Sequence, residues 1–333
     1  MKTEKEMMDM ILRIAREDDR IRAVYMCGSR CNPNASRDIF QDYDIVYVVR
    51  ETESFIRDKA WPEVFGERLL MQLPMELDRI AGEECHFDRE YAYLIQLRDG
   101  NRVDCVLRTI QAAGEDITAN RLNRILLDKD GCLPEIPEAS DEGHWVKCPG
   151  QEEYSRCCNE FWWLLLNVGK GLWREELTYV MEMLNQWVRP ESFRMLSWYA
   201  GTEHGFSFSA GKGGKYLWKF LPESLWNAYL DTYPECRTNR IWEAVERLCN
   251  LFSGTARKVG QDLEFSYDTG EEEASRYYLR RVKALPREAG RVFDSDSSEQ
   301  DCACTGQKYG PDLRGTAQTK KKCLPKQREN EKL

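Results

Sequence analysis

The segment that most constrains the fold lies near the N-terminus, where two apolar runs flank a polar loop. The composition of residues 21–27 predicts a strand, which Gly28-Ser29 ends. Residues 43–49 are β-branched or aromatic almost throughout, which predicts a buried strand. Asp42 and Asp44 stand where this second strand begins, and the alternation of side chains along a strand places both carboxylates on one face. The segment therefore predicts a sheet with two acids at one edge.

A third acid follows on a later strand. Residues 98–101, Arg-Asp-Gly-Asn, are typical of a hairpin turn, so a strand over residues 102–110 should return antiparallel beside one over 91–97. Asp104 is the lone charge facing away from the apolar residues of this strand. Carboxylates brought together repel unless a cation lies between them, and magnesium prefers carboxylate, water and phosphate oxygens. We expect Asp42, Asp44 and Asp104 to hold magnesium and to accept the proton of an attacking hydroxyl.

The Gly28-Ser29 turn supplies the complementary part of such a site. Glycine allows close approach of the backbone, and the amides with the Ser29 hydroxyl can hold phosphate oxygens. Taken alone, a Gly-Ser turn is usually only a turn, and Asp-x-Asp at a strand edge is often a solvated end. The combination with a third acid on a later strand favours a nucleotidyltransferase.

This pattern resembles the DNA polymerase β-like nucleotidyltransferase superfamily, in which Gly-Ser is followed about a dozen residues later by Asp-x-Asp. The wider sequence resembles one branch, the aminoglycoside 6-adenylyltransferases, which modify streptomycin. The resemblance extends from the first helix to about residue 285. It rests on residues 22–30, 32–34, 38–49, 99–102, 126–131, 159–163 and 170–176.

The resemblance implies a resistance enzyme that transfers AMP from Mg-ATP to the 6-hydroxyl of streptomycin and releases pyrophosphate. It implies that Asp42 and Asp44 bind magnesium and that Asp104 is the general base. Ser29 and Arg30 would contact the phosphates. The three acids act on the phosphates of ATP and do not select the acceptor. Another aminoglycoside, a lincosamide or a protein side chain therefore remains an alternative acceptor. A catalytically silent nucleotide-binding or toxin-antitoxin module is a further alternative, disfavoured by the complete set of acids.

The composition and the periodicity of apolar residues change along the chain. A helix over 3–18 precedes the first strand, and a helix over 53–65 and a strand over 68–73 complete the expected mixed sheet. Proline-rich segments end this part near residue 150. Beyond it, long helical patterns carry most of the tryptophans, and we assign most of these tryptophans to the core. We expect an α/β (α+β) nucleotidyltransferase domain over 1–149, an all-helical substrate-binding domain over 150–288 and a disordered tail over 289–333.

Two groups of residues in the helical part are candidates for substrate contact. Lys212 and Lys215 lie in a glycine-rich basic stretch suited to a triphosphate, although such a stretch can also be a solvated loop. Streptomycin carries two guanidinium groups, which carboxylates and an aromatic face can bind. One predicted helix contains residues of both kinds, each equally compatible with a structural or solvent role: Trp173, Glu175, Glu176 and Glu182.

The composition limits the kinds of molecule that this protein is suited to bind. The net charge of −9 argues against a nucleic-acid-binding protein and suits a cationic partner. The 13 cysteines lack paired spacing for zinc or redox chemistry, so we expect most of them, including Cys157-Cys158, to be small buried residues in a reducing compartment. No apolar run is long enough to span a bilayer. We expect a cytoplasmic monomer that binds ATP and an aminoglycoside.

Overall fold

The structure is a computed structural model that describes residues 1–293. The chain divides into two compact units, Met1–Gly143 and a second unit that begins at His144. The predicted boundary at residues 149–150 falls between that point and Gln151, where the first long helix of the second unit begins. Most of the predicted tail, residues 294–333, lies outside the described residues.

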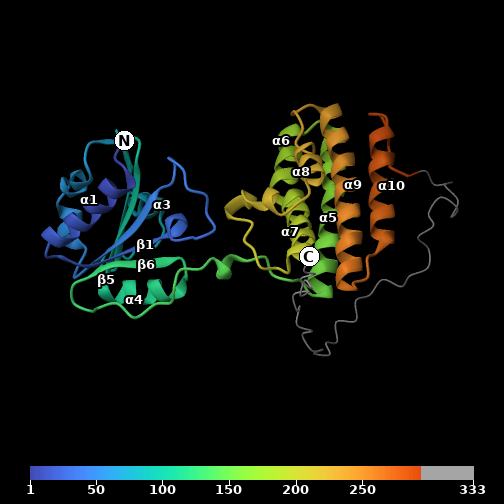
Figure 1. The fold of residues 1–333 in the computed structure, drawn as a ribbon. Coiled ribbons are helices and arrows are strands. Elements are labelled where there is room, and N and C mark those ends of the chain that lie inside the picture. The colour runs from blue at the N-terminus through green and yellow to red at the C-terminus, as the bar shows by residue number, and fades with distance from the viewer. Residues whose placement is uncertain (294–333) are drawn as a thin grey trace, which may run out of the picture. The chain divides into compact units, whose positions relative to one another are not determined.

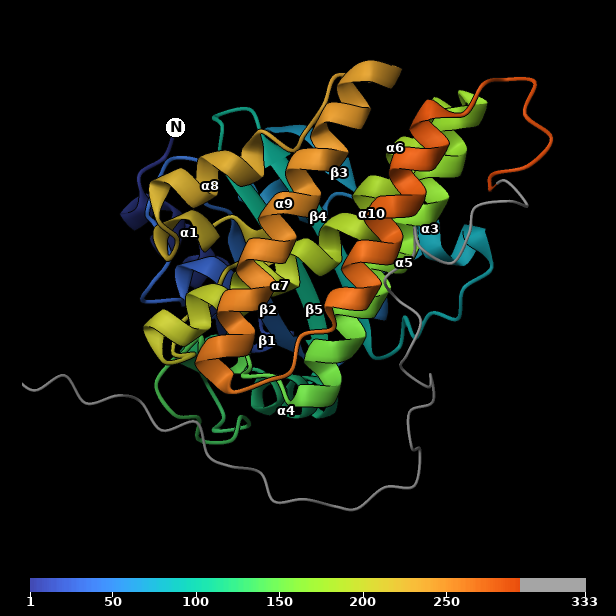
Figure 2. The ribbon, with the colours of Figure 1, turned by 90° about the vertical axis from the view of Figure 1, so that its right-hand side faces the viewer.

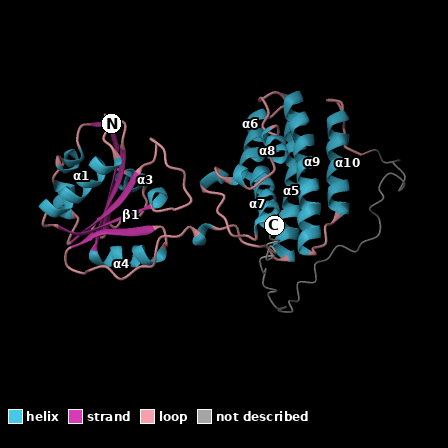
Figure 3. Ribbon diagram, in the orientation of Figure 1, coloured by secondary structure: helices cyan, strands magenta, loops and turns pink. Residues whose placement is uncertain are grey.

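The first unit is built on a mixed six-stranded sheet with the order β3-β4-β5-β2-β1-β6 (Figures 1 and 3). Strands β2 and β5 run parallel, and the other neighbouring strands are antiparallel. The strands are β1 Ile21–Cys27, β2 Tyr43–Val49, β3 Arg68–Gln72, β4 Glu90–Leu97, β5 Arg102–Thr109 and β6 Asn123–Asp128. The predicted strands are all present, whereas β6 was not predicted.

Helices cover the two faces of this sheet unequally. Helix α1 (Glu4–Glu17) packs on the face that carries Ile45 and Tyr47, in a core that also contains Met7 and Ile11. Helix α4 (Ile110–Ala119) covers the opposite face over Val46 and Val48, through Ala113 and Ile117. Asp44 alternates with Val46 and so shares the α4 face. It is only half-buried, because α4 packs on the later part of the strand.

The predicted helix over residues 53–65 is wrong in its length. The segment contains α2 (Glu53–Arg57) and, separately, a 3₁₀ turn over Trp61–Phe65. Pro62 disfavours one continuous α-helix, because it has no N–H to donate to the Asp58 carbonyl oxygen and its ring would clash with that carbonyl. Helix α3 (Pro74–Ala81) lies between β3 and β4 and was not predicted.

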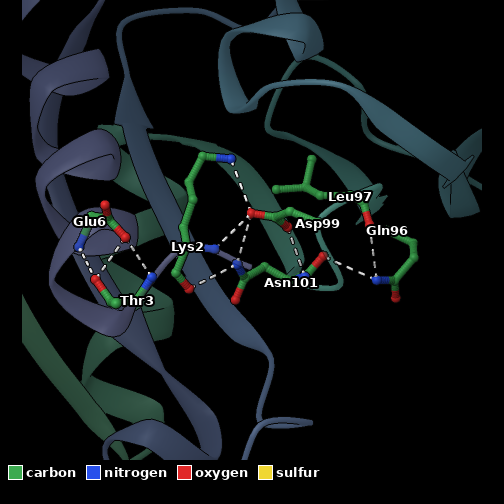
Figure 4. A network of polar contacts seen from close by, with 7 residues as sticks. All are labelled: Lys2, Thr3, Glu6, Gln96, Leu97, Asp99 and Asn101. Carbon is green, nitrogen blue, oxygen red and sulfur yellow. Dashed lines mark hydrogen bonds and ion pairs between the residues drawn. The ribbon is translucent and has the colours of Figure 1, made fainter.

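A polar network fastens the start of α1 to the β4–β5 hairpin (Figure 4). The Asp99 carboxylate accepts hydrogen bonds from the backbone N–H groups of Lys2 and Asn101, each at 3.0 Å. The Asn101 side chain, only 3% exposed, donates to the Lys2 carbonyl oxygen at 3.2 Å. Thr3 caps α1 in a reciprocal pair with Glu6. The hairpin that leads into β5 is therefore held in place by the N-terminus.

The regular secondary structure of the second unit is helical in its described residues, as predicted. Helices α5 and α10 lie side by side, as do α7 and α9 (Figure 2). A π-helical segment, Met183–Val188, joins α6 to α7. The helices are α5 Gln151–Arg174, α6 Leu177–Glu182, α7 Arg189–His204, α8 Glu223–Leu230, α9 Thr238–Leu263 and α10 Thr269–Ala284. Among the described residues, no helix combines the length and apolarity that crossing a membrane requires.

The assignment of tryptophans to the core is only partly correct. Trp162, Trp198 and Trp242 are buried, with exposed fractions of 2%, 3% and 9%. Three others are more than half exposed: Trp163, Trp187 and Trp218. The adjacent Cys157 and Cys158 are buried free thiols, which agrees with the structural role expected for them.

Candidate active site

Two of the predicted catalytic acids are direct neighbours across the sheet. In the parallel pairing of β2 with β5, Asp44 lies opposite Asp104. Neighbouring strands are about 4.8 Å apart, so two side chains in register on one face are adjacent. Asp42 lies two residues before Asp44, at the entrance of the same strand. The hairpin forms as predicted, but the parallel β2–β5 pairing is what places Asp104 beside Asp44.

Gly28, in the turn predicted to bind phosphate, lies directly against the Asp44 side chain. Its φ of +72° is in the left-handed region, and a Cβ at this position would lie 2.4 Å from Asp44 Oδ2. Ser29 follows within the 3₁₀ turn Gly28–Arg30. The turn therefore approaches the carboxylate so closely that a side chain at this position would force Asp44 to shift.

Arg30 supports the backbone before β2. Its side chain is buried, and its Nε and Nη2 donate to the carbonyl oxygens of Asp42 and Gln41 at 2.9 and 2.8 Å. Its guanidinium carbon lies 3.7 Å from the centre of the Tyr43 ring. These contacts make Arg30 a positioning residue for Asp42, and phosphate contact by Arg30 stays a prediction.

The acids perturb one another electrostatically. Burial, followed by the charges of Asp104 and Asp42, raises the pKa of Asp44 from 3.8 to about 6. Arg102 offsets part of this repulsion. Its Nε and Nη2 donate to Asp104 Oδ1 and Oδ2 at 2.8 and 2.9 Å, and its Nε lies 3.9 Å from Asp42 Oδ2. Arg102 lies two residues before Asp104 on β5 and shares its face, so the prediction that Asp104 is the lone charge on that face is wrong.

The donor chemistry of this edge fits magnesium. A hard cation takes carboxylate oxygens, and Mg²⁺ is usually held by one or two carboxylates together with waters and substrate phosphates. Among residues 1–293, no three acidic, histidine or cysteine side chains converge closely enough to hold a metal ion by themselves. Both oxygens of Asp104 accept hydrogen bonds from Arg102. Asp42 and Asp44 fit a site that nucleotide phosphates complete.

A second polar cluster extends the same face of the sheet. Arg108, four residues beyond Asp104 on β5, donates from Nε to Glu90 Oε2 at 2.9 Å and forms an ion pair with Asp116 on α4. The buried Tyr25 hydroxyl donates to Asp116 Oδ2 at 2.6 Å. A cavity of about 310 Å³ adjoins this cluster. We did not predict this cluster from the sequence, although the spacing of four residues between Asp104 and Arg108 places both on one face of a strand.

The predicted basic stretch of the helical unit forms a tight loop. Lys212 and Lys215 are both exposed. They alternate with three glycines of positive φ, Gly211, Gly213 and Gly214. Gly214 is constrained sterically as well, because a Cβ would lie 2.1 Å from the Phe193 ring. The loop thus presents two lysine side chains from a backbone conformation that requires glycine.

The proposed drug-binding residues do not lie in one helix, so that part of the prediction is wrong. Helix α5 ends at Arg174, and Glu175 adopts a left-handed conformation that caps it. Glu182 is the last residue of the next helix, α6, and is exposed. Trp173 Nε1 donates to the Leu285 carbonyl oxygen at 3.1 Å. The remaining acids face cations: Glu175 pairs with Arg287 and Glu176 with Arg174.

The sequence matches known proteins over most of its length. The sequence profile of the family described as streptomycin adenylyltransferase matches residues 1–282. The chain is 37% identical over 279 residues to the aminoglycoside 6-adenylyltransferase of Bacillus subtilis (strain 168), covering 83% of this chain and 97% of that protein. It is 35% identical over 283 residues to the Campylobacter jejuni enzyme of the same name, covering 85% and 97%.

A third relative, the aminoglycoside 6-adenylyltransferase of Staphylococcus aureus, is 31% identical over 278 residues, covering 83% of this chain and 98% of that protein. A crystal structure of an aminoglycoside 6-adenyltransferase from Bacillus subtilis aligns with 86% of this chain and 100% of its own, at 32% identity and a TM-score of 0.43.

These matches show that the chain is a nucleotidyltransferase, and the mixed sheet, the paired acids and the glycine turn are compatible with that class. Within this class, the chain belongs to the streptomycin adenylyltransferase family.

Proposed function

We propose that this enzyme transfers AMP from Mg-ATP to the 6-hydroxyl of streptomycin and thereby confers resistance to the drug. The observation that carries the proposal is the register that sets Asp44 beside Asp104, with Gly28 packed against Asp44. The names of three relatives support an aminoglycoside acceptor and its 6-position. The net charge of −9 is compatible with a cationic acceptor.

In the proposed reaction the acceptor oxygen attacks the α-phosphorus of ATP. A new phosphorus–oxygen bond forms, the bond to the bridging oxygen of pyrophosphate breaks, and pyrophosphate leaves with that electron pair. Asp104 would take the proton of the acceptor hydroxyl, and its position beside Asp44 on the neighbouring strand supports this role. Magnesium held by Asp42 and Asp44, with Asp104 as a further ligand, would supply neutralisation of the triphosphate charge.

The remaining residues bind and orient the substrates. The amides of the Gly28-Ser29 turn and the Ser29 hydroxyl are suited to phosphate oxygens, while Arg30 fixes the segment that carries Asp42. Lys212 and Lys215 add positive charge for the triphosphate. We retain Trp173, Glu175, Glu176 and Glu182 as candidate drug contacts, of which Glu182 is an exposed acid at the end of its helix.

A pyrophosphate-release assay across a panel of acceptors tests the proposal. The protein is incubated with Mg-ATP and streptomycin, other aminoglycosides or a lincosamide, and the product is analysed by mass spectrometry and NMR for AMP and its position. We expect one AMP on the 6-oxygen of streptomycin. If pyrophosphate is released with another acceptor but not with streptomycin, that compound and not streptomycin is the substrate. If no acceptor causes release of pyrophosphate, the proposal is refuted. Expression in a susceptible bacterium should raise the inhibitory concentration of streptomycin.

A further inference from the structure

The residues of the candidate active site follow one order across the sheet. Strand β2 lies between β1 and β5, and β5 lies between β2 and β4. Gly28, directly after β1, lies against the Asp44 side chain. Asp44 lies opposite Asp104, and Asp104 lies opposite Leu94 on β4. A row therefore runs from the turn proposed to bind phosphate, through two of the acids, to Leu94.

This order sets the side from which an acceptor reaches the phosphorus. In displacement at phosphorus, the attacking and leaving oxygens are roughly in line. In the proposed reaction the Gly28-Ser29 turn holds the phosphates, so pyrophosphate leaves on the β1 side of Asp44. The attacking hydroxyl then comes from the opposite side, where Asp104 lies and β4 follows. We therefore expect the acceptor on β4 and β5.

The structure leaves this part of the sheet partly open. Leu94 and Ala92 pair with Asp104 and Val106 across the two strands and share their face. The three apolar side chains are only half-buried, whereas the residues that alternate with them belong to the core on the α1 side. Helix α4 packs on the same face, chiefly over β1 and β2. A partly exposed apolar surface with a few polar groups is typical of a small-molecule site.

A charged cavity lies at the far end of this surface, where the start of β4, the end of β5 and α4 meet. Its volume is about 310 Å³, and its lining includes three acids and two arginines: Glu90, Glu115, Asp116, Arg89 and Arg108. Each acid pairs with one of the arginines, yet a carboxylate that accepts from a guanidinium keeps free lone pairs. The surplus negative charge and these lone pairs suit a cationic group.

We propose that the acceptor binds along this surface, which we call the acceptor face and define by four residues: Glu90, Ala92, Leu94 and Val106. The rings of the acceptor lie on the three apolar side chains, a cationic group enters the cavity beside Glu90, and the reacting hydroxyl lies at Asp104. Glu90 pairs with the residue four positions beyond Asp104 on β5, a span of about 13 Å. The ligand is therefore a cationic saccharide of more than one ring.

The inference rests on the proposed function, because it takes Asp104 as the proton acceptor and the Gly28-Ser29 turn as the phosphate site. It adds two residues that determine acceptor affinity from outside the reacting centre. Ala92 acts through shape, because its small side chain leaves room for a ring. Glu90 acts through charge, at the cavity.

The substitution Ala92→Phe tests the shape of the acceptor face. The new ring would occupy the place of the acceptor, so KM for streptomycin should rise at least about tenfold in pyrophosphate-release kinetics with saturating Mg-ATP. Calorimetry should show the same loss of streptomycin affinity and an unchanged affinity for a nonhydrolysable ATP analogue. Thermal unfolding first checks that the variant folds, and Ala92→Leu replaces it if it does not.

The substitution Glu90→Gln tests the charge at the cavity. KM for streptomycin should rise about fivefold, and the effect should shrink at high salt because exposed charges are screened. Asp130→Asn is the matched control. The Asp130 side chain is 40% exposed and that of Glu90 41%, and each pairs with an arginine, but Asp130 follows β6 at the other edge of the sheet. The control should keep the wild-type KM.

Distinct outcomes separate the inference from the function on which it rests. If wild type releases no pyrophosphate with any acceptor, the proposed function fails. If wild type modifies streptomycin while the Ala92 and Glu90 variants keep its KM, the acceptor face is overturned. Variants that lose affinity for the ATP analogue as severely as for streptomycin would also overturn it, because the surface would then not be specific to the acceptor. An equal effect of Asp130→Asn and Glu90→Gln would overturn the charge argument.

Discussion

Replacing Asp44 by Asn should abolish turnover and yet make the metal-free protein more stable at neutral pH. The stability gain follows from the raised pKa. Burial and the neighbouring acids raise the pKa of Asp44 from 3.8 to about 6, so the charged form is less favourable in the folded than in the unfolded chain. An asparagine at this position would keep the shape of the side chain but carry no charge. Turnover is lost because a metal-binding charge is removed.

The magnitude follows from the size of the shift. About two pH units correspond to about 3 kcal/mol, and because Asp44 is only half-buried, solvent screening reduces this to about 1–2 kcal/mol. Below pH 3.8 the carboxyl is protonated in both states, so the substitution has no electrostatic effect there. The advantage of the variant grows as the pH rises from 3.8 to about 6 and is constant above that value.

The assay is thermal or urea unfolding in the presence of EDTA, at pH 4 and at pH 8. At pH 8 the midpoint temperature of Asp44→Asn should exceed that of wild type by about 3–6 °C, and at pH 4 the difference should largely vanish. Magnesium should stabilise wild type more than the variant, since only an intact site binds it well. A variant less stable than wild type at pH 8 without metal would refute the electrostatic reasoning, and full turnover would refute the metal assignment.

Three further predictions concern the acids and the turns that position them. Asp104→Asn should still bind Mg-ATP, while the rate of transfer to streptomycin falls by roughly 10²- to 10⁴-fold in single-turnover kinetics. If this variant instead loses ATP affinity as severely as Asp42→Asn does, Asp104 is mainly a metal ligand. Gly28→Ala, whose new Cβ would lie 2.4 Å from Asp44 Oδ2, should lower kcat/KM by about 100-fold. Gly82→Ala is its control, because that glycine also has positive φ but no atom within 4 Å of a new Cβ; an equal loss of activity would contradict the steric argument. Although burial opposes it, hydrogen bonds from Asn101 and Lys2 lower the pKa of Asp99, so Asp99→Asn should cost about 1–2 kcal/mol at pH 7. That cost should shrink as the pH falls below 3.8 in urea titrations, and a pH-independent cost would contradict the assignment.

The sequence predicted those parts of the fold that local patterns encode. The strands over residues 21–27 and 43–49 and the hairpin turn are set by side-chain type and alternation within a few residues, and each was found as expected. The prediction that Asp42 and Asp44 share a face rests on the two-residue period of a strand, whereas β2 begins at Tyr43, one residue after Asp42. The helical character of the second unit follows from its apolar periodicity. Patterns failed where a single residue interrupts them, as Pro62 does in the segment predicted as one helix.

Only the tertiary structure decided how distant segments meet. Asp104 lies beside Asp44 because β5 pairs in parallel with β2, a pairing set by packing of the whole sheet and not by the residues near either strand. The contacts of Arg30 with the backbone around Asp42 and of Gly28 with Asp44 depend in the same way on how the turn after β1 meets the start of β2. Sequence patterns specify which face a residue takes, because that depends on local backbone geometry. Which charges then lie within a few ångströms depends on strand order and register, and these are determined by the free energy of the assembled core.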